Sequence, residues 1–167
     1  MSEVEHVSHN ITEYNIDQKH IFSYQETNGK TGSNSGFSIL IVDDDPDILE
    51  CYKQLFDYEG YRTETVSTPS EAIQRAEETR FNLAILDYTL PHMRGDELAL
   101  RLLETNSSMK LMFISGHNEA ETSIMNRGLD TRFFMKPIDP ECLLGAARSV
   151  LHEDRLMHVN DVIVKMA

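Results

Sequence analysis

Cysteine, tryptophan and long apolar runs are scarce or absent in this chain. Its 167 residues include 2 Cys, no Trp and 5 Pro. Cys51 and Cys142 are 91 residues apart and have no CxxC spacing, which disfavours a disulfide scaffold and a zinc site. No run approaches the roughly 18 consecutive apolar residues of a membrane span, and the N-terminus lacks a basic region followed by an apolar one. These absences predict a soluble, unexported cytoplasmic protein in which both cysteines are free, buried thiols.

Positive charge is also scarce. The chain has 15 Lys and Arg residues against 28 Asp and Glu residues, and its formal net charge is -13. A strongly acidic surface repels phosphate backbones and anionic lipids, so direct binding to nucleic acid and association with membranes are disfavoured. The length fits one domain of roughly 100 to 150 residues with flanking segments.

Composition divides the chain into three segments. Residues 1–36 contain 9 apolar residues and end in a Gly/Ser/Asn run, which predicts a flexible N-terminal arm and linker. Residues 37–152 contain 20 acidic and 11 basic residues, and therefore -9 of the net charge of -13, together with clear strand and helix patterns. In the C-terminal tail, residues 153–167, apolar residues recur at helical spacing, so the last helix either continues into the tail or restarts there.

Strand signals recur from residue 37 onward. Residues 37–42 (FSILIV) form a nearly continuous apolar run, as expected for a strand that is buried on both faces of a parallel sheet. Further strands are predicted at residues 61–66, 81–87, 110–115 and 132–135.

Helix signals alternate with these strands. Asp45 before a proline is a typical N-cap, and Thr68 with Glu71 forms a capping box. Five strands alternating with five helices predict an α/β fold with a doubly wound, five-stranded parallel sheet of flavodoxin-like order 2-1-3-4-5. The predicted helices span residues 45–59, 68–79, 96–105, 118–127 and 139–152.

Polar side chains stand at the ends of the four strands that this order makes neighbours. Asp43 and Asp44 follow the first strand, Asp87 ends the third, Ser115 ends the fourth and Lys136 follows the fifth. Ligands of such sheets bind at the carboxyl ends of the central strands, next to the point where the strand order reverses. We therefore expect these side chains to converge in one crevice.

The residue types in this crevice indicate phosphoryl chemistry. Three carboxylates at close range repel one another unless protons or a cation offset their charge. Mg²⁺ fits this role because it takes oxygen ligands and coordinates phosphoryl oxygens with its remaining positions. Lys136 and the Ser115 hydroxyl would stabilise the phosphoryl oxygens while Asp87 attacks in line. The acids at the first strand argue against a flavin or dinucleotide site, which needs a loop rich in glycine or hydroxyl groups.

Four motifs at these strand ends resemble the receiver domain of two-component response regulators. They are ILIVDDDPDIL (39–49), LAILDYTLPHMRGDEL (83–98), MFISGH (112–117) and FFMKPID (133–139), in the order and spacing of that family. The resemblance covers about residues 37–152. It implies a signalling phosphoprotein in a phosphorelay rather than an enzyme, apart from phosphoryl transfer to its own aspartate and slow autodephosphorylation.

The resemblance implies a role for each residue that matches a family position. Asp87 would carry the aspartyl phosphate and also contact the metal. Asp43 and Asp44 would be the acid pair that binds Mg²⁺, with Asp44 favoured as the direct ligand. The backbone carbonyl of Thr89 would complete the protein ligands, and Lys136 would contact the phosphoryl group.

Further positions match the family's switch and tuning residues. Ser115 fills the place of the switch hydroxyl, where the family more often has threonine, and Phe133 fills that of the switch aromatic. Thr89 and His117 occupy the variable positions that tune phosphoryl lifetime. The bond before Pro137 is a candidate for a cis peptide.

Partners also follow from the resemblance. A sensor histidine kinase or a histidine phosphotransfer protein would supply the phosphoryl group. An output protein would bind the face formed by the fourth helix, fifth strand and fifth helix, and a homodimer is left open. With 15 residues after His152, we expect no output domain, so the chain is either a stand-alone regulator or a piece of a longer one.

Two other functions remain open. A Mg²⁺-dependent phosphohydrolase with an aspartate nucleophile would share the carboxylates but needs a general acid two residues after the nucleophile, where this chain has Thr89. A receiver-like scaffold that is never phosphorylated is the other alternative, and the complete set of acids, hydroxyl and lysine counts against it.

Overall fold

The computed structural model describes residue 34, residues 36–117 and residues 119–165. The strands of this part of the chain are β1 (Ser38–Val42), β2 (Arg62–Val66), β3 (Leu83–Asp87), β4 (Lys110–Ser115) and β5 (Thr131–Met135). Its helices are α2 (Pro46–Tyr58), α3 (Pro69–Glu78), α4 (Gly95–Thr105), α5 (Glu119–Asn126) and α6 (Pro140–Lys165).

The strands form one parallel sheet of order β2-β1-β3-β4-β5. The predicted flavodoxin-like, doubly wound fold is therefore confirmed. All five residues of β1 and of β3 are buried, because both strands lie inside the sheet and are covered on both faces. The edge strand β2 mixes exposed and buried positions instead, which explains its weaker apolar pattern.

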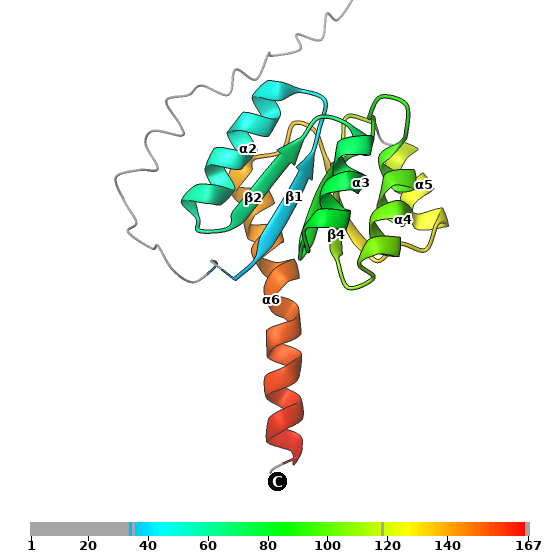
Figure 1. Cartoon of the computed structure of the whole chain (residues 1–167). Helices are drawn as coiled ribbons and strands as arrows, with labels where there is room; N and C mark the ends of the chain where they lie inside the picture. Colours follow the sequence, from blue (N-terminus) through cyan, green and yellow to red (C-terminus); the bar gives the residue numbers. More distant parts are fainter. Residues whose placement is uncertain (1–33, 35, 118, 166–167) are drawn as a thin grey trace, which may run out of the picture.

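Helices cover both faces of the sheet (Figure 1). On one face, alternate residues of β1 and β3 such as Ile39 and Ile85 pack in a cluster with Phe56 of α2 and Leu143 of α6. On the other face, their neighbours such as Leu40 pack in a second cluster with residues of α3, α4 and α5. The two cores arise because successive side chains of a strand point to opposite faces of a sheet.

The helix starts agree with the predicted caps. The Asp45 side chain accepts hydrogen bonds from two backbone N–H groups of the first turn of α2. The Thr68 hydroxyl accepts one from the Glu71 N–H, with 3.3 Å between nitrogen and oxygen. The Glu71 carboxylate accepts a hydrogen bond from the N–H of Ser67, whereas a capping box would use the N–H of Thr68.

The last helix is longer than its predicted end at residue 152. α6 continues without a break to Lys165, so the helix runs on into the tail rather than restarting there. Figure 1 shows that its C-terminal part extends away from the sheet. None of the helices in the described part of the chain combines the length and the apolar character that a bilayer span requires.

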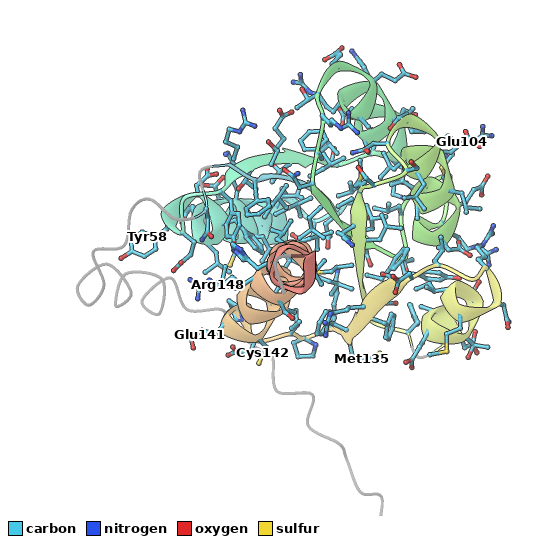
Figure 2. All side chains as sticks on the ribbon, turned by 90° about the horizontal axis from the view of Figure 1, so that it is seen from below. Tyr58, Glu104, Met135, Glu141, Cys142 and Arg148 are labelled. Carbon is cyan, nitrogen blue, oxygen red and sulfur yellow. The ribbon has the colours of Figure 1, made fainter. Side chains whose placement is uncertain are left out.

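The two cysteines differ in exposure. Both thiols are free and Cys51 is buried as expected, but Cys142 is exposed, so the prediction of a buried thiol at this position is wrong. Cys142 lies in the first turn of α6, where the next residue, Leu143, turns toward the core instead. In Figure 2 Cys142 lies at the outer surface beside Glu141.

Candidate functional site

The acidic residues after β1 and at the end of β3 meet at one edge of the sheet. Because β1 and β3 pair in parallel, their carboxyl ends lie side by side. One carboxylate oxygen from each of Asp43, Asp44 and Asp87 lies within 4.8 Å of the others. Asp43 and Asp87 are buried, whereas Asp44 is exposed. The structure thus brings together the three carboxylates that the sequence places at strand ends.

Lys136 adds a positive charge to this cluster. Its Nζ lies 2.6 Å from Oδ2 of Asp43 and 3.3 Å from Oδ2 of Asp87. Burial by itself acts to lower the pKa of the Lys136 ammonium, but its hydrogen bond to Asp43 and the charges of Asp43 and Asp87 raise that pKa above its usual value. The lysine is therefore cationic near neutral pH, and it offsets one of three carboxylate charges.

The side chain of Asp87 is largely buried from solvent. Its Oδ1 accepts a hydrogen bond from the backbone N–H of Thr89, at 3.3 Å. Burial is the main cause that raises the pKa of the Asp87 carboxyl, and the neighbouring charge of Asp43 adds to it. Lys136 and the Thr89 N–H act in the opposite direction without cancelling the rise. The charged form of the Asp87 carboxyl is thus less stable here than it would be in water.

Asp43 is fixed by two hydrogen bonds. Its Oδ1 accepts from the backbone N–H of Asp45 at 3.0 Å, and its Oδ2 accepts from Nζ of Lys136. Asp45 itself caps α2, so the three successive acids have different surroundings. Asp43 is oriented by protein groups, while the exposed Asp44 remains accessible to an incoming ligand.

Ser115 lies next to this cluster, but its hydroxyl is engaged elsewhere. In the register of the sheet Asp87 pairs with Ile114, so Ser115 stands one residue beyond the residue that faces Asp87. Its side chain is fully buried, and Oγ accepts from the His117 N–H at 3.0 Å and lies 3.4 Å from the His117 carbonyl oxygen. No hydrogen bond within the described residues joins the Ser115 hydroxyl to Asp87.

The loop after β5 completes this edge of the sheet. The Lys136 N–H donates to the Ser115 carbonyl oxygen at 2.8 Å, and the peptide bond between Lys136 and Pro137 is cis, as predicted. Phe133, which is paired with Phe113 in β4, is partly buried against the core cluster on the side of α3, α4 and α5. His117 is exposed in the loop before α5.

Gly95 contributes to the site in a way that sequence reasoning missed. A Cβ atom at this first residue of α4 would lie 2.4 Å from the Asp87 carbonyl oxygen and 2.9 Å from the Tyr88 Cα. The Gly95 N–H also donates to the Tyr88 carbonyl oxygen at 2.9 Å. The start of α4 is therefore packed closely against the backbone of Asp87 and Tyr88. A lone glycine at the beginning of a helix was the available signal.

Comparison with known proteins assigns this chain to a family. The family model of the response regulator receiver domain matches residues 39–148, which is more than half of the chain. The chain therefore belongs to the response regulator receiver domain family and contains a receiver domain of two-component signalling.

Relatives and solved structures agree with this assignment. The chain is 34% identical over 116 residues to the response regulator protein TmoT of Ectopseudomonas mendocina, covering 68% of this chain and 52% of that one. It is 29% identical over 118 residues to the DNA-binding response regulator MtrA of Mycolicibacterium smegmatis, covering 70% of this chain and 51% of that one. The crystal structure of a CheY-like receiver domain protein from Methanospirillum hungatei has a TM-score of 0.67 and 36% identity, over 72% of this chain and 98% of that one. The first curated relatives are longer, since the match covers between 31% and 52% of their length.

Proposed function

We propose that Asp87 accepts a phosphoryl group from a phosphohistidine of a partner protein, either a sensor histidine kinase or a histidine phosphotransfer protein. The observation that carries the proposal is the convergence of Asp43, Asp44, Asp87 and Lys136 at one edge of the sheet. Membership of the receiver family supports it, because signalling by this family proceeds through a histidine kinase and an output partner.

The proposed transfer is a displacement at phosphorus. An oxygen of the Asp87 carboxylate forms the new P–O bond while the P–N bond to the partner's histidine breaks. The imidazole nitrogen keeps the electron pair of that bond and then takes up a proton. Burial removes water from the Asp87 carboxylate, which leaves the anion less solvated and more reactive.

Lys136 is placed to hold the transferred group. Its Nζ already lies 3.3 Å from Oδ2 of Asp87, so a small movement brings it to an oxygen of a phosphoryl group on that residue. The link from Nζ to Asp43 keeps the ammonium group at the site when no phosphoryl group is present. Its raised pKa keeps the charge in place.

The donor set fits Mg²⁺. Three carboxylate oxygens within 4.8 Å of one another are hard ligands, and a single lysine leaves two of their charges uncompensated. We propose that Asp44, Asp87 and the Thr89 carbonyl hold the ion, with Asp43 as the second member of the acid pair. When bound, Mg²⁺ would neutralise charge on the phosphoryl oxygens.

The division of the chain is part of the same proposal. Residues 37–152 would be the receiver domain, between an N-terminal arm of residues 1–36 and a tail of residues 153–167. We propose that the face formed by α5, β5 and α6 binds the output protein, with Ser115 and Phe133 as switch residues. A second copy of the chain is an alternative occupant of that face. The excess of acidic residues supports a receiver that makes no direct contact with nucleic acid, whatever an output partner binds.

The test is phosphorylation by acetyl phosphate in the presence of Mg²⁺, followed by intact-mass measurement. Wild-type protein is expected to gain the mass of one phosphoryl group and to lose it slowly after the donor is removed. Asp87→Asn is expected to gain none. Asp45→Asn is the matched control, because asparagine also caps helices well and Asp45 faces α2 rather than the cluster.

Two results would contradict the proposal. One is a wild-type protein that gains no phosphoryl mass and binds no Mg²⁺. The other is equal labelling of wild type and Asp87→Asn, which would place the acceptor elsewhere. Sustained turnover of phosphate esters that is lost in Asp87→Asn would instead favour a phosphohydrolase.

A further inference from the structure

A second carboxylate, outside the acidic cluster, is buried in α4 and pairs with an arginine just after the end of α5. The side chain of Asp96, in the first turn of α4, has no exposed surface. Its Oδ2 accepts from Nε of Arg127 at 2.5 Å and from Oγ of Ser123 at 3.0 Å. Its Oδ1 has no hydrogen-bond partner, and Nε of Arg94 lies 3.7 Å away. We call Asp96, Ser123 and Arg127 the α4–α5 clamp.

The clamp holds its carboxylate in the charged form. Burial acts to raise the pKa of Asp96, but the hydrogen bonds from Arg127 and Ser123 and the charges of Arg127 and Arg94 lower it below its usual value. Hydrogen bonds that involve a charged group are the stronger kind. Ser123 lies in α5 and Arg127 directly follows the last residue of that helix, so the clamp fastens the C-terminal end of α5 to α4. Figure 1 shows these helices next to each other.

The α4 side of the clamp contacts the backbone of Asp87 and Tyr88. Asp96 directly follows Gly95, whose Cα packs against the backbone of Asp87 and Tyr88 so closely that no Cβ fits between them. The Gly95 N–H is bonded to the Tyr88 carbonyl oxygen. The position of Asp96 is therefore fixed relative to the end of β3.

The other end of α5 is tied to Ser115. The Ser115 hydroxyl is bonded within its own turn to the N–H of His117, and the His117 carbonyl oxygen accepts from the N–H of Ala120 in α5 at 3.2 Å. Apart from these bonds, α5 buries only two side chains, Ala120 and Ile124. A helix with so small an apolar contact depends on polar bonds to stay in place.

These observations lead to a proposal that rests on the proposed function. A phosphoryl group on Asp87 can receive a hydrogen bond from Ser115 only if the Ser115 hydroxyl stops donating to the His117 carbonyl oxygen, which removes a bond that holds the turn before α5. We propose that the α4–α5 clamp restrains α5 in the arrangement of the unphosphorylated domain and thereby lowers its affinity for a phosphoryl group. Asp96, Ser123 and Arg127 are thus positioning residues that act through α5.

A purely structural clamp makes a different prediction. If the ion pair were equally intact with and without a phosphoryl group, removing it would change stability but not phosphoryl affinity. A ligand shifts an equilibrium only by its differential affinity for the two states. Affinity for a phosphoryl mimic therefore separates the two cases.

The experiment measures binding of beryllium fluoride, a mimic of a carboxylate-bound phosphoryl group, in the presence of Mg²⁺. Arg127→Gln removes the charge of the clamp and keeps much of the side chain's length. We expect it to bind the mimic about 5-fold more tightly than wild type, the lower end of usual coupling effects. Amide hydrogens of residues 119–126 are expected to exchange faster in the variant without the mimic.

Control variants make the comparison specific. Arg101→Gln removes an exposed partner of Glu104 on α4 and is expected to leave the affinity unchanged. Arg127→Lys can still donate to Asp96 and is expected to restore most of the wild-type affinity. Should Arg127→Gln not fold, Ser123→Ala decides the question, because it removes one hydrogen bond and no charge and is expected to tighten binding in the same direction.

The failures of the two proposals are distinguishable. Wild-type protein that binds beryllium fluoride, together with an Arg127→Gln or Ser123→Ala variant of equal or weaker affinity, would overturn the clamp and leave the proposed function intact. Wild-type protein that binds neither Mg²⁺ nor the mimic would overturn the proposed function, and the clamp proposal with it.

Discussion

At the scale of single residues, the backbone at His92 is held in a costly conformation. Among the non-glycine residues that the structure describes, His92 is the one with a positive φ, which is 68°. His92 lies exposed in the loop between β3 and α4. An L-residue in this region costs roughly 1–2 kcal/mol, whereas glycine adopts it readily.

We therefore expect His92→Gly to raise the free energy of unfolding by about 0.5–1 kcal/mol, after the larger loss of chain entropy at glycine is deducted. Urea denaturation would measure the change. His92→Ala is the control, because alanine keeps the steric cost at positive φ and should not stabilise. An equal gain from alanine would show that the histidine side chain, not the backbone, causes the cost.

The two thiols provide a second prediction at this scale. Cys142 is exposed and Cys51 is buried, and burial raises the pKa of the Cys51 thiol and so disfavours its reactive thiolate. With a chromogenic thiol reagent, we expect one reactive thiol per chain in the native protein and two in the unfolded protein. Cys142→Ser should remove the native signal, while Cys51→Ser should preserve it. Rapid reaction of both thiols in the native state would contradict the packing of α2.

At the scale of elements, the junction of β3 and α4 matters most for the site. Gly95→Ala would drive a Cβ into the Asp87 carbonyl, and overpacking of this kind costs about 1–3 kcal/mol. We expect lower stability and weaker Mg²⁺ binding, because the end of β3 must shift. Thermal unfolding with and without Mg²⁺ would measure both effects.

Gly145→Ala is the matched control for this substitution. Gly145 lies in α6, and a Cβ there would meet nothing within 4 Å. Alanine should therefore stabilise α6 by up to about 1 kcal/mol through its higher helix propensity, with no effect on Mg²⁺ binding. Destabilisation by both substitutions would show that the close contact at Gly95 is not the cause.

Element prediction succeeded where the local signals were strong. The apolar runs of β1 and β3 marked strands buried on both faces, and Asp45 and Thr68 marked helix starts through side chains that bond the first turn. The sequence left open whether α6 stops near residue 152 or continues, because no glycine or proline follows His152 to end the helix, and α6 continues to Lys165. Where the sequence has no glycine or proline to end a helix, the local pattern does not determine the helix's last residue.

At the scale of the whole molecule, part of the net charge of -13 is concentrated in the cluster of Asp43, Asp44 and Asp87. The buried carboxylates of Asp43 and Asp87, with Asp44 beside them, repel one another when no cation is bound. A cation that binds only the folded chain stabilises it by mass action, by about 2.7 kcal/mol at a concentration of 100 times Kd.

We therefore expect Mg²⁺ to raise the Tm of wild-type protein in a concentration-dependent manner. Asp44→Asn should reduce this shift strongly, because it removes the charge of a proposed ligand from the accessible side of the cluster. Asp130→Asn removes an exposed charge at the opposite end of the sheet, before β5, and should leave the shift intact. Equal shifts in all three proteins would indicate unspecific screening instead of a metal site.

The amino-acid sequence by itself determined the elements, their order and the meeting of Asp43, Asp87 and Lys136, because parallel neighbours place their carboxyl ends together. Only the tertiary structure decided which way side chains turn. The Ser115 hydroxyl bonds within its own turn, and Asp96 is buried against α5. Such contacts depend on rotamers and on the packing of helices that are distant in sequence, which no local pattern encodes.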